Sequence, residues 1–69
     1  MKNKISIYGF KRVVIEGYDR ILSIAATEIR LNNFVVIGSD LKIIALDTYL
    51  IEISGDIQEV KNEVYNNNN

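Results

Sequence analysis

The sequence predicts an all-β fold: a single small domain of about seven or eight short strands, arranged as an antiparallel meander, sandwich or roll. Apolar and polar residues alternate along most of the 69-residue chain, which is the pattern of half-buried strands. The alternating positions are rich in isoleucine and valine, and both residues favour strands. Breaks that contain glycine, asparagine or aspartate separate the strands at intervals of about eight residues, as in other all-β domains.

Pairs of alternating apolar residues mark the strands in order along the chain. The first pair is Ile5 with Ile7, and the last is Ile51 with Ile53. Because alternate residues of a strand point to the same face, each pair should lie on one buried face. The residues predicted to form the core are Ile5, Ile7, Val13, Ile15, Ile29, Leu31, Val35, Ile37, Leu41, Ile43, Ile51, Ile53 and Ile57.

Residues 20–31, RILSIAATEIRL, allow two interpretations. Leu22, Ala25, Ala26 and Ile29 lie at helical spacing, so an amphipathic helix is one alternative. The segment is also rich in β-branched residues, and no strong cap precedes it; both features disfavour a helix. Two strands joined near Ala25 and Ala26 are therefore the favoured interpretation.

Turn residues separate the predicted strands. They are Gly9, Gly17, Asn32, Asn33, Gly38, Asp40, Gly55 and Asp56. Two similar triplets, Gly38-Ser39-Asp40 and Ser54-Gly55-Asp56, have the length of a three-residue hairpin loop. If the chain reverses at the first triplet, Ile37 faces Leu41 on one core face. The second triplet would pair the isoleucines on either side of it in the same way.

A short β-solenoid is the alternative architecture. In that fold the two triplets would be corners, and VVIGSDLKI and IEISGDIQEV would be successive stacked rungs. In either architecture, residues 1–65 are expected to form the single β domain. The asparagine run 66–69 has no apolar side chain to bury, so a disordered tail is expected there.

The composition limits what can stabilise so small a core. A chain of this length buries only about 60% of the surface that its unfolded form exposes. The sequence has no cysteine and no histidine, which excludes disulfides, thiolate metal sites and the usual zinc ligand. Self-association or a protein partner is the remaining support, so a homo-oligomer is expected. We expect no transmembrane segment and no signal peptide, and hence a cytoplasmic location.

No group of residues predicts an enzyme. The serines have no histidine partner, a glycine-rich phosphate loop is absent, and the carboxylates fall in turns or at solvent-facing positions. The sequence therefore predicts no catalytic, cofactor-binding or metal-binding residue, and it indicates no small-molecule substrate.

One short stretch is typical of a surface that stacks nucleic-acid bases. Tyr8 and Phe10 stand beside Lys11 and Arg12, which combines aromatic rings with positive charge. The formal net charge of −1 nevertheless disfavours nucleic-acid binding. Residues 51–60 also loosely resemble the closing strand pattern of Sm-like ring proteins. A small Sm-like or other β-barrel that binds nucleic acid is therefore the alternative function.

Three segments, taken in order and spacing, carry a family resemblance. They are VIEGYDRIL (residues 14–22), IGSDLKIIALD (37–47) and IEISGDIQEV (51–60). Together they resemble the YabP/YqfC family of sporulation proteins from endospore-forming Firmicutes. This resemblance implies production in the mother cell during spore formation and a part in spore morphogenesis. The positions that match the family pattern are Gly17, Ile21, Leu22, Gly38, Leu41, Leu46 and Gly55, and they are interpreted as turn and core positions.

The strand edges are the remaining feature with functional meaning. The strands are short and rich in isoleucine and valine, and the chain contains no proline. An edge of this kind is a template for another strand unless it is blunted. The sequence therefore predicts a non-enzymatic structural protein that associates with itself through strand edges, or through solenoid ends.

Overall fold

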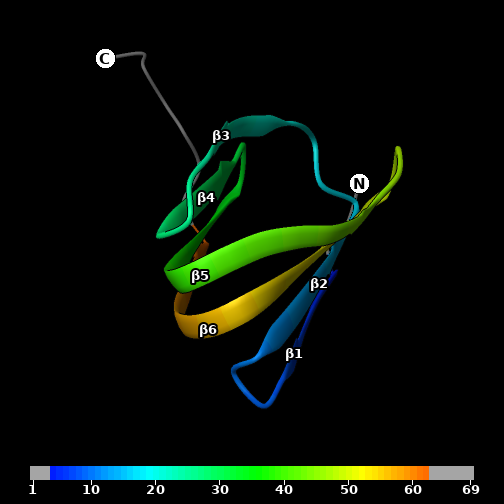
Figure 1. Ribbon diagram of the computed structural model, residues 1–69. Helices are drawn as coiled ribbons and strands as arrows, with labels where there is room; N and C mark the ends of the chain where they lie inside the picture. The colour runs from blue at the N-terminus through cyan, green and yellow to red at the C-terminus, as the bar shows by residue number, and fades with distance from the viewer. Residues whose placement is uncertain (1–3, 63–69) are drawn as a thin grey trace.

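The computed structural model describes residues 4–62, which form six strands and no helix. The strands are β1 (Lys4–Tyr8), β2 (Arg12–Glu16), β3 (Ile21–Ile24), β4 (Glu28–Leu31), β5 (Phe34–Leu46) and β6 (Leu50–Asn62). They form one antiparallel sheet in the order β1-β2-β6-β5-β4-β3 (Figure 1). The all-β antiparallel prediction is confirmed. The solenoid alternative is wrong, because every strand pair of residues 4–62 is antiparallel.

The predicted hairpin turns at the two triplets are wrong. Gly38 and Asp40 lie inside β5, and Gly55 and Asp56 lie inside β6. The chain bends at these positions and continues, so two long strands replace four short ones, and the strand count is six. Irregularities in the β5–β6 register flank the first triplet, and such bulges bend a strand and increase its twist.

The local sequence could not distinguish a turn from a bulge. Both structures need residues that tolerate left-handed backbone angles, and Asp40 and Gly55 adopt φ values of 54° and 141°. The difference lies in the partner strand. Because β5 and β6 pair with each other on both sides of the bends, neither strand reverses there.

The bend of β5 is held by the tip of the β3–β4 hairpin. The N–H of Gly38 donates to the carbonyl of Thr27 at 3.1 Å, and the N–H of Leu41 donates to the carbonyl of Ala26 at 2.9 Å. Beyond this point, residues 42–46 of β5 pair with β6 alone among the described residues. The first half of β5 therefore lies beside the β3–β4 hairpin, and the second half extends past the end of that hairpin.

The bend of β6 repeats this arrangement with the β1–β2 hairpin. The N–H of Gly55 donates to the carbonyl of Lys11 at 3.0 Å, and the N–H of Ile57 donates to the carbonyl of Phe10 at 2.9 Å. Figure 1 shows the two long strands curving side by side, with one hairpin next to each of them. The described residues therefore form two similar halves, each made of a hairpin and parts of both long strands.

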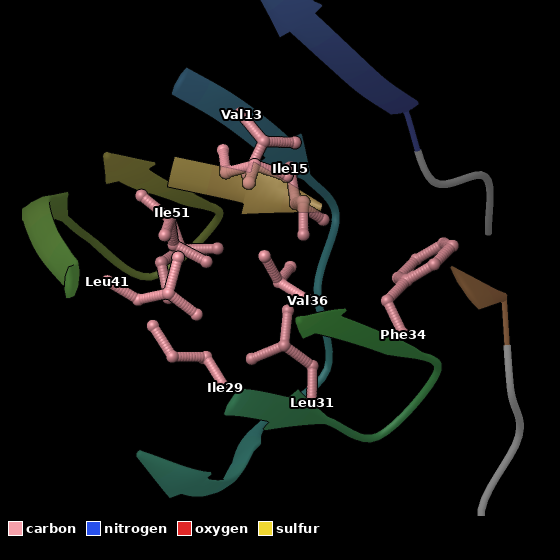
Figure 2. Close-up of a cluster of buried hydrophobic side chains, with 10 residues drawn as sticks. Val13, Ile15, Ile29, Leu31, Phe34, Val36, Leu41 and Ile51 are labelled. Atoms are coloured by element: carbon pink, nitrogen blue, oxygen red, sulfur yellow. The ribbon is translucent and has the colours of Figure 1, made fainter. Parts of the chain in front are cut away.

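The core lies on the concave face of this curved sheet, which we call the inner face. Its side chains come from β2, β4, β5 and β6 and point toward one another (Figure 2). Those of Val13, Ile15, Ile29, Ile51 and Ile53 have no exposed surface. The cluster consists of Val13, Ile15, Ile29, Leu31, Phe34, Val36, Leu41, Ile51, Ile53 and Ile57.

Other predicted core residues lie elsewhere. Ile5 and Ile43 are half-buried and pack against the cluster. Ile7 is 48% exposed on the edge strand β1, so its assignment to the core is wrong. In the apolar run at the start of β5, Phe34 and Val36 contribute to the cluster, whereas Val35 is buried outside it and Ile37 is only half-buried. Alternation of apolar and polar residues could not show which residues of this uninterrupted apolar run face the core.

The segment 20–31 forms strands, not a helix. β3 and β4 are joined at residues 25–27, and Ala25 and Glu28 exchange main-chain hydrogen bonds across this tight connection. The β-branched residues thus adopt the conformation that suits them.

The other predicted turn residues lie at strand ends. Gly9 and Gly17 follow β1 and β2, with φ values of 63° and 76°, and Asn32 and Asn33 connect β4 to β5. The tail predicted for residues 66–69 lies outside the described residues.

Candidate functional site: the open edges of the sheet

Four stretches of strand have a neighbour on one side only, within residues 4–62. Two are the outer strands of the sheet, β1 and β3. The other two exist because β5 and β6 are longer than the hairpins beside them. These are residues 42–46 of β5 and residues 58–62 of β6. Each such stretch directs main-chain N–H and C=O groups away from the sheet, and these groups can pair with another strand.

Apolar side chains line three of these edges on the inner face. Ile7 stands opposite the buried Val13, Ile24 opposite Ile29, and Leu46 opposite Ile51. Opposed residues share a face of the sheet, so the edge residues continue the core surface. Ile24 and Leu46 are nevertheless 58% and 54% exposed. The apolar inner face therefore extends beyond the part that this chain covers.

The tip of the β1–β2 hairpin carries the aromatic and basic residues that resembled a base-stacking surface. The guanidinium of Arg12 lies 4.6 Å from the ring centroid of Tyr8. Its Nη1 also lies 3.2 Å from a carboxylate oxygen of Glu52. Phe10 lies between Tyr8 and Arg12 in the sequence. Its side chain is 64% exposed, and its backbone φ of 58° is left-handed. The structure thus brings the residues together, but with the Arg12 charge engaged within the chain.

Lys11 is engaged as well. Its Nζ donates to Oδ1 of Asp56 at 2.5 Å, on the β6 bend. This hydrogen bond, together with the negative charge of Asp56, raises the pKa of Lys11 above its ordinary value of 10.5. Both side chains are well exposed, so this ion pair adds little to stability. Its effect is to leave the hairpin tip with less unneutralised positive charge than the sequence suggests.

The loop between β5 and β6 contains a well-defined carboxylate. Asp47 accepts hydrogen bonds from the main-chain N–H groups of Tyr49 at 2.8 Å and Leu50 at 2.9 Å. These bonds lower the pKa of Asp47 below its ordinary value of 3.8. The hydroxyl of Tyr18 donates to the Asp47 carbonyl at 2.6 Å and ties this loop to the β2–β3 connection. The arrangement explains Asp47 as a structural residue.

Little in residues 4–62 offers groups for chemistry. Every buried side chain there is apolar, and no cluster of acidic residues could hold a metal ion. The part of the chain that the structure describes also contains no helix with the length and apolarity needed to cross a membrane. The open edges are therefore the candidate functional site within the described residues.

Comparisons with protein-family models, with curated proteins and with solved structures gave no match to this chain.

The sequence pattern indicates open strand edges in general, but it does not show which residues form them. Ile24 was not predicted to lie on an edge, and Leu46 was interpreted as a turn or core position, which is wrong because its side chain is 54% exposed. An exposed aliphatic residue at an open edge has the same alternation as a buried one on a central strand. The available signal was length: thirteen-residue strands beside strands of four or five residues must have unpaired ends. That signal was hidden by the assignment of turns at the two triplets.

Proposed function

We propose that this protein is a non-enzymatic assembly protein that associates with further copies of itself through open strand edges. The observation that carries the proposal is an apolar inner face that continues onto exposed edge residues, namely Ile7, Ile24 and Leu46. Pairing with another strand would satisfy the outward main-chain groups and remove apolar surface from water at the same time. Both effects favour association.

The edges also have few of the features that prevent such pairing. The chain has no proline, which is the residue that most directly blocks a ladder. On β1 the single charged residue is Lys4, and residues 42–46 of β5 carry Lys42 alone. An irregular register between Ile21 and Ser23 blunts β3 to some degree. The other edges can accept a strand.

The biological setting of this proposal comes from the resemblance to the YabP/YqfC sporulation proteins. We place the assembly in the mother cell of a sporulating bacterium, as a structural component in spore morphogenesis. In a spore-forming host, a fluorescent fusion should appear in the mother cell during spore formation. Expression confined to vegetative cells would contradict this setting without affecting the association itself.

The association is tested by size-exclusion chromatography with light scattering over a wide concentration range. A mass well above the 7.9 kDa of one chain, rising with concentration, is expected. Electron microscopy then distinguishes discrete particles, which indicate a closed complex, from filaments, which indicate open stacking. A 7.9 kDa species at high micromolar concentration would reject the proposal.

A further inference from the structure

The outer half of β6, residues 58–62, differs from the other open edges in its charge pattern. Ile57 donates its N–H to the carbonyl of Phe10, and after that point β6 pairs only with β5 among the described residues. In the sequence QEVKN, Glu59 and Lys61 stand on either side of Val60. Both charged side chains are exposed, and no ion pair within residues 4–62 involves either of them.

The direction of the main-chain groups follows from the pairing of β5. The N–H of Gly38 points to the carbonyl of Thr27, on the β4 side. Because these directions alternate along an antiparallel strand, Ile37 and Val35 point their groups toward β6. Their register partners are Glu59 and Lys61, which point back toward β5. The N–H and C=O of Val60, between them, therefore point outward from the open edge.

An antiparallel ladder centred on Val60 fits this geometry. Val60 of one copy would exchange two hydrogen bonds with Val60 of the other. The flanking residues would then form non-hydrogen-bonded pairs, whose Cα atoms lie only about 4.5 Å apart and whose side chains are close. Each Glu59 would lie directly opposite a Lys61 of the other copy, so two complementary charge pairs would form.

The inner face supports the same register. Val60 is half-buried and packs against the core cluster of its own chain. In the ladder it would face Val60 of the second copy, which joins the two apolar inner faces. The sheet would then run without interruption from β3, β4, β5 and β6 of one copy into β6, β5, β4 and β3 of the other.

The other edges lack this complementarity. β3 has no charged residue, β1 has Lys4 alone, and residues 42–46 of β5 have Lys42 alone. Pairing any of these edges with itself brings together no opposite charges. Among the open edges of residues 4–62, only residues 58–62 are electrostatically complementary to themselves.

We propose that residues 58–62 of β6 form a two-fold symmetric dimer interface with a second copy of this chain, centred on Val60. This inference rests on the self-association proposed above and specifies its edge, register and symmetry. A two-fold interface uses the same surface on both copies, so it closes on itself. This edge therefore yields a dimer, and any larger assembly must use another edge.

The test is a charge-reversal cycle on the full chain, with dimer dissociation measured by analytical ultracentrifugation. Glu59→Lys and Lys61→Glu each place like charges opposite each other twice per dimer. Each should therefore raise the dimer Kd by roughly tenfold or more. The double variant E59K/K61E restores opposite charges, and its Kd should return to near the wild-type value. Lys42→Glu, on the open half of β5, is the matched control and should leave the Kd unchanged.

Far-UV circular dichroism should show an unchanged fold in all four variants, because the three altered side chains are exposed. If the wild type dimerises but the single reversals leave the Kd unchanged, the β6 interface is overturned and self-association stands. The same conclusion follows if the double variant dissociates as readily as the single ones. If the wild type is monomeric throughout, both the interface and the proposed function fail.

Discussion

Gly38 of β5 and Gly55 of β6 occupy equivalent positions, each packed against the main chain of the other strand's bend. A β-carbon at Gly55 would lie 2.6 Å from the carbonyl oxygen of Asp40, and one at Gly38 would meet the carbonyl of Asp56 even more closely. The two paired strands thus lie backbone against backbone at their bends. No residue larger than glycine fits at either point without moving a main chain.

Alanine at either bend should therefore be severely destabilising. Gly38→Ala and Gly55→Ala should each lower the free energy of unfolding by about 2 kcal/mol or more, because the added methyl group meets main chain that cannot rotate away. Gly9→Ala is the matched control. It has φ of 63° but nothing within 4 Å, so only the backbone cost of about 1 kcal/mol applies. Urea unfolding followed by circular dichroism measures all three, and an equal loss at the three positions would contradict the close packing.

The central position of Ile53 can be tested by removing a single methylene group from its side chain. Ile53 has no exposed surface and pairs with Val13 on one side and Ile43 on the other. Ile53→Val should cost about 1 kcal/mol of unfolding free energy, the usual price of a small cavity in a packed core. Ile24→Val, on the exposed edge β3, should stay within about 0.5 kcal/mol of wild type. Similar losses for the two variants would argue against this core.

The carboxylate of Asp47 should make stability depend on pH in the acid range. Its pKa is lowered in the folded state by the N–H groups of Tyr49 and Leu50, so its ionised form stabilises the fold above the unfolded pKa of about 3.8. That contribution is lost as the pH falls through the lower, folded pKa. The melting temperature of the wild type should exceed that of Asp47→Asn at neutral pH, and the gap should close toward pH ~2. A gap that does not change with pH would rule out a role for the charge.

The basic hairpin tip should not bind nucleic acid tightly. Arg12 is engaged by Glu52 and Tyr8, and Lys11 by Asp56, while the whole chain carries a net charge of −1. Fluorescence anisotropy with labelled single-stranded oligonucleotides should show no saturable binding at low salt. Saturable binding that weakens steeply with added salt would instead support the Sm-like alternative, because it reports the release of counterions from phosphates.

The strand content of this fold was predictable because it depends on local pattern. The alternation around Val13 and Ile15, and around Ile51 and Ile53, reports a two-faced strand regardless of which strands become neighbours. The tight connection at residues 25–27 was also predictable, because the β-branched residues on both sides of it disfavour a helix. Whether Val35 or Val36 faces the core could not be predicted, because an unbroken apolar run has no alternation of apolar and polar residues.

The sequence by itself determined that this chain is all-β, where most of its core residues lie, and that it has no cysteine or histidine for stabilising bonds. Only the tertiary structure decided that Gly38-Ser39-Asp40 and Ser54-Gly55-Asp56 are bends inside two long strands. The reason is physical: glycine and aspartate permit both a turn and a bulge, and the strand that pairs across the site selects one of them. The same pairing leaves residues 58–62 with a neighbouring strand on one side only, among residues 4–62.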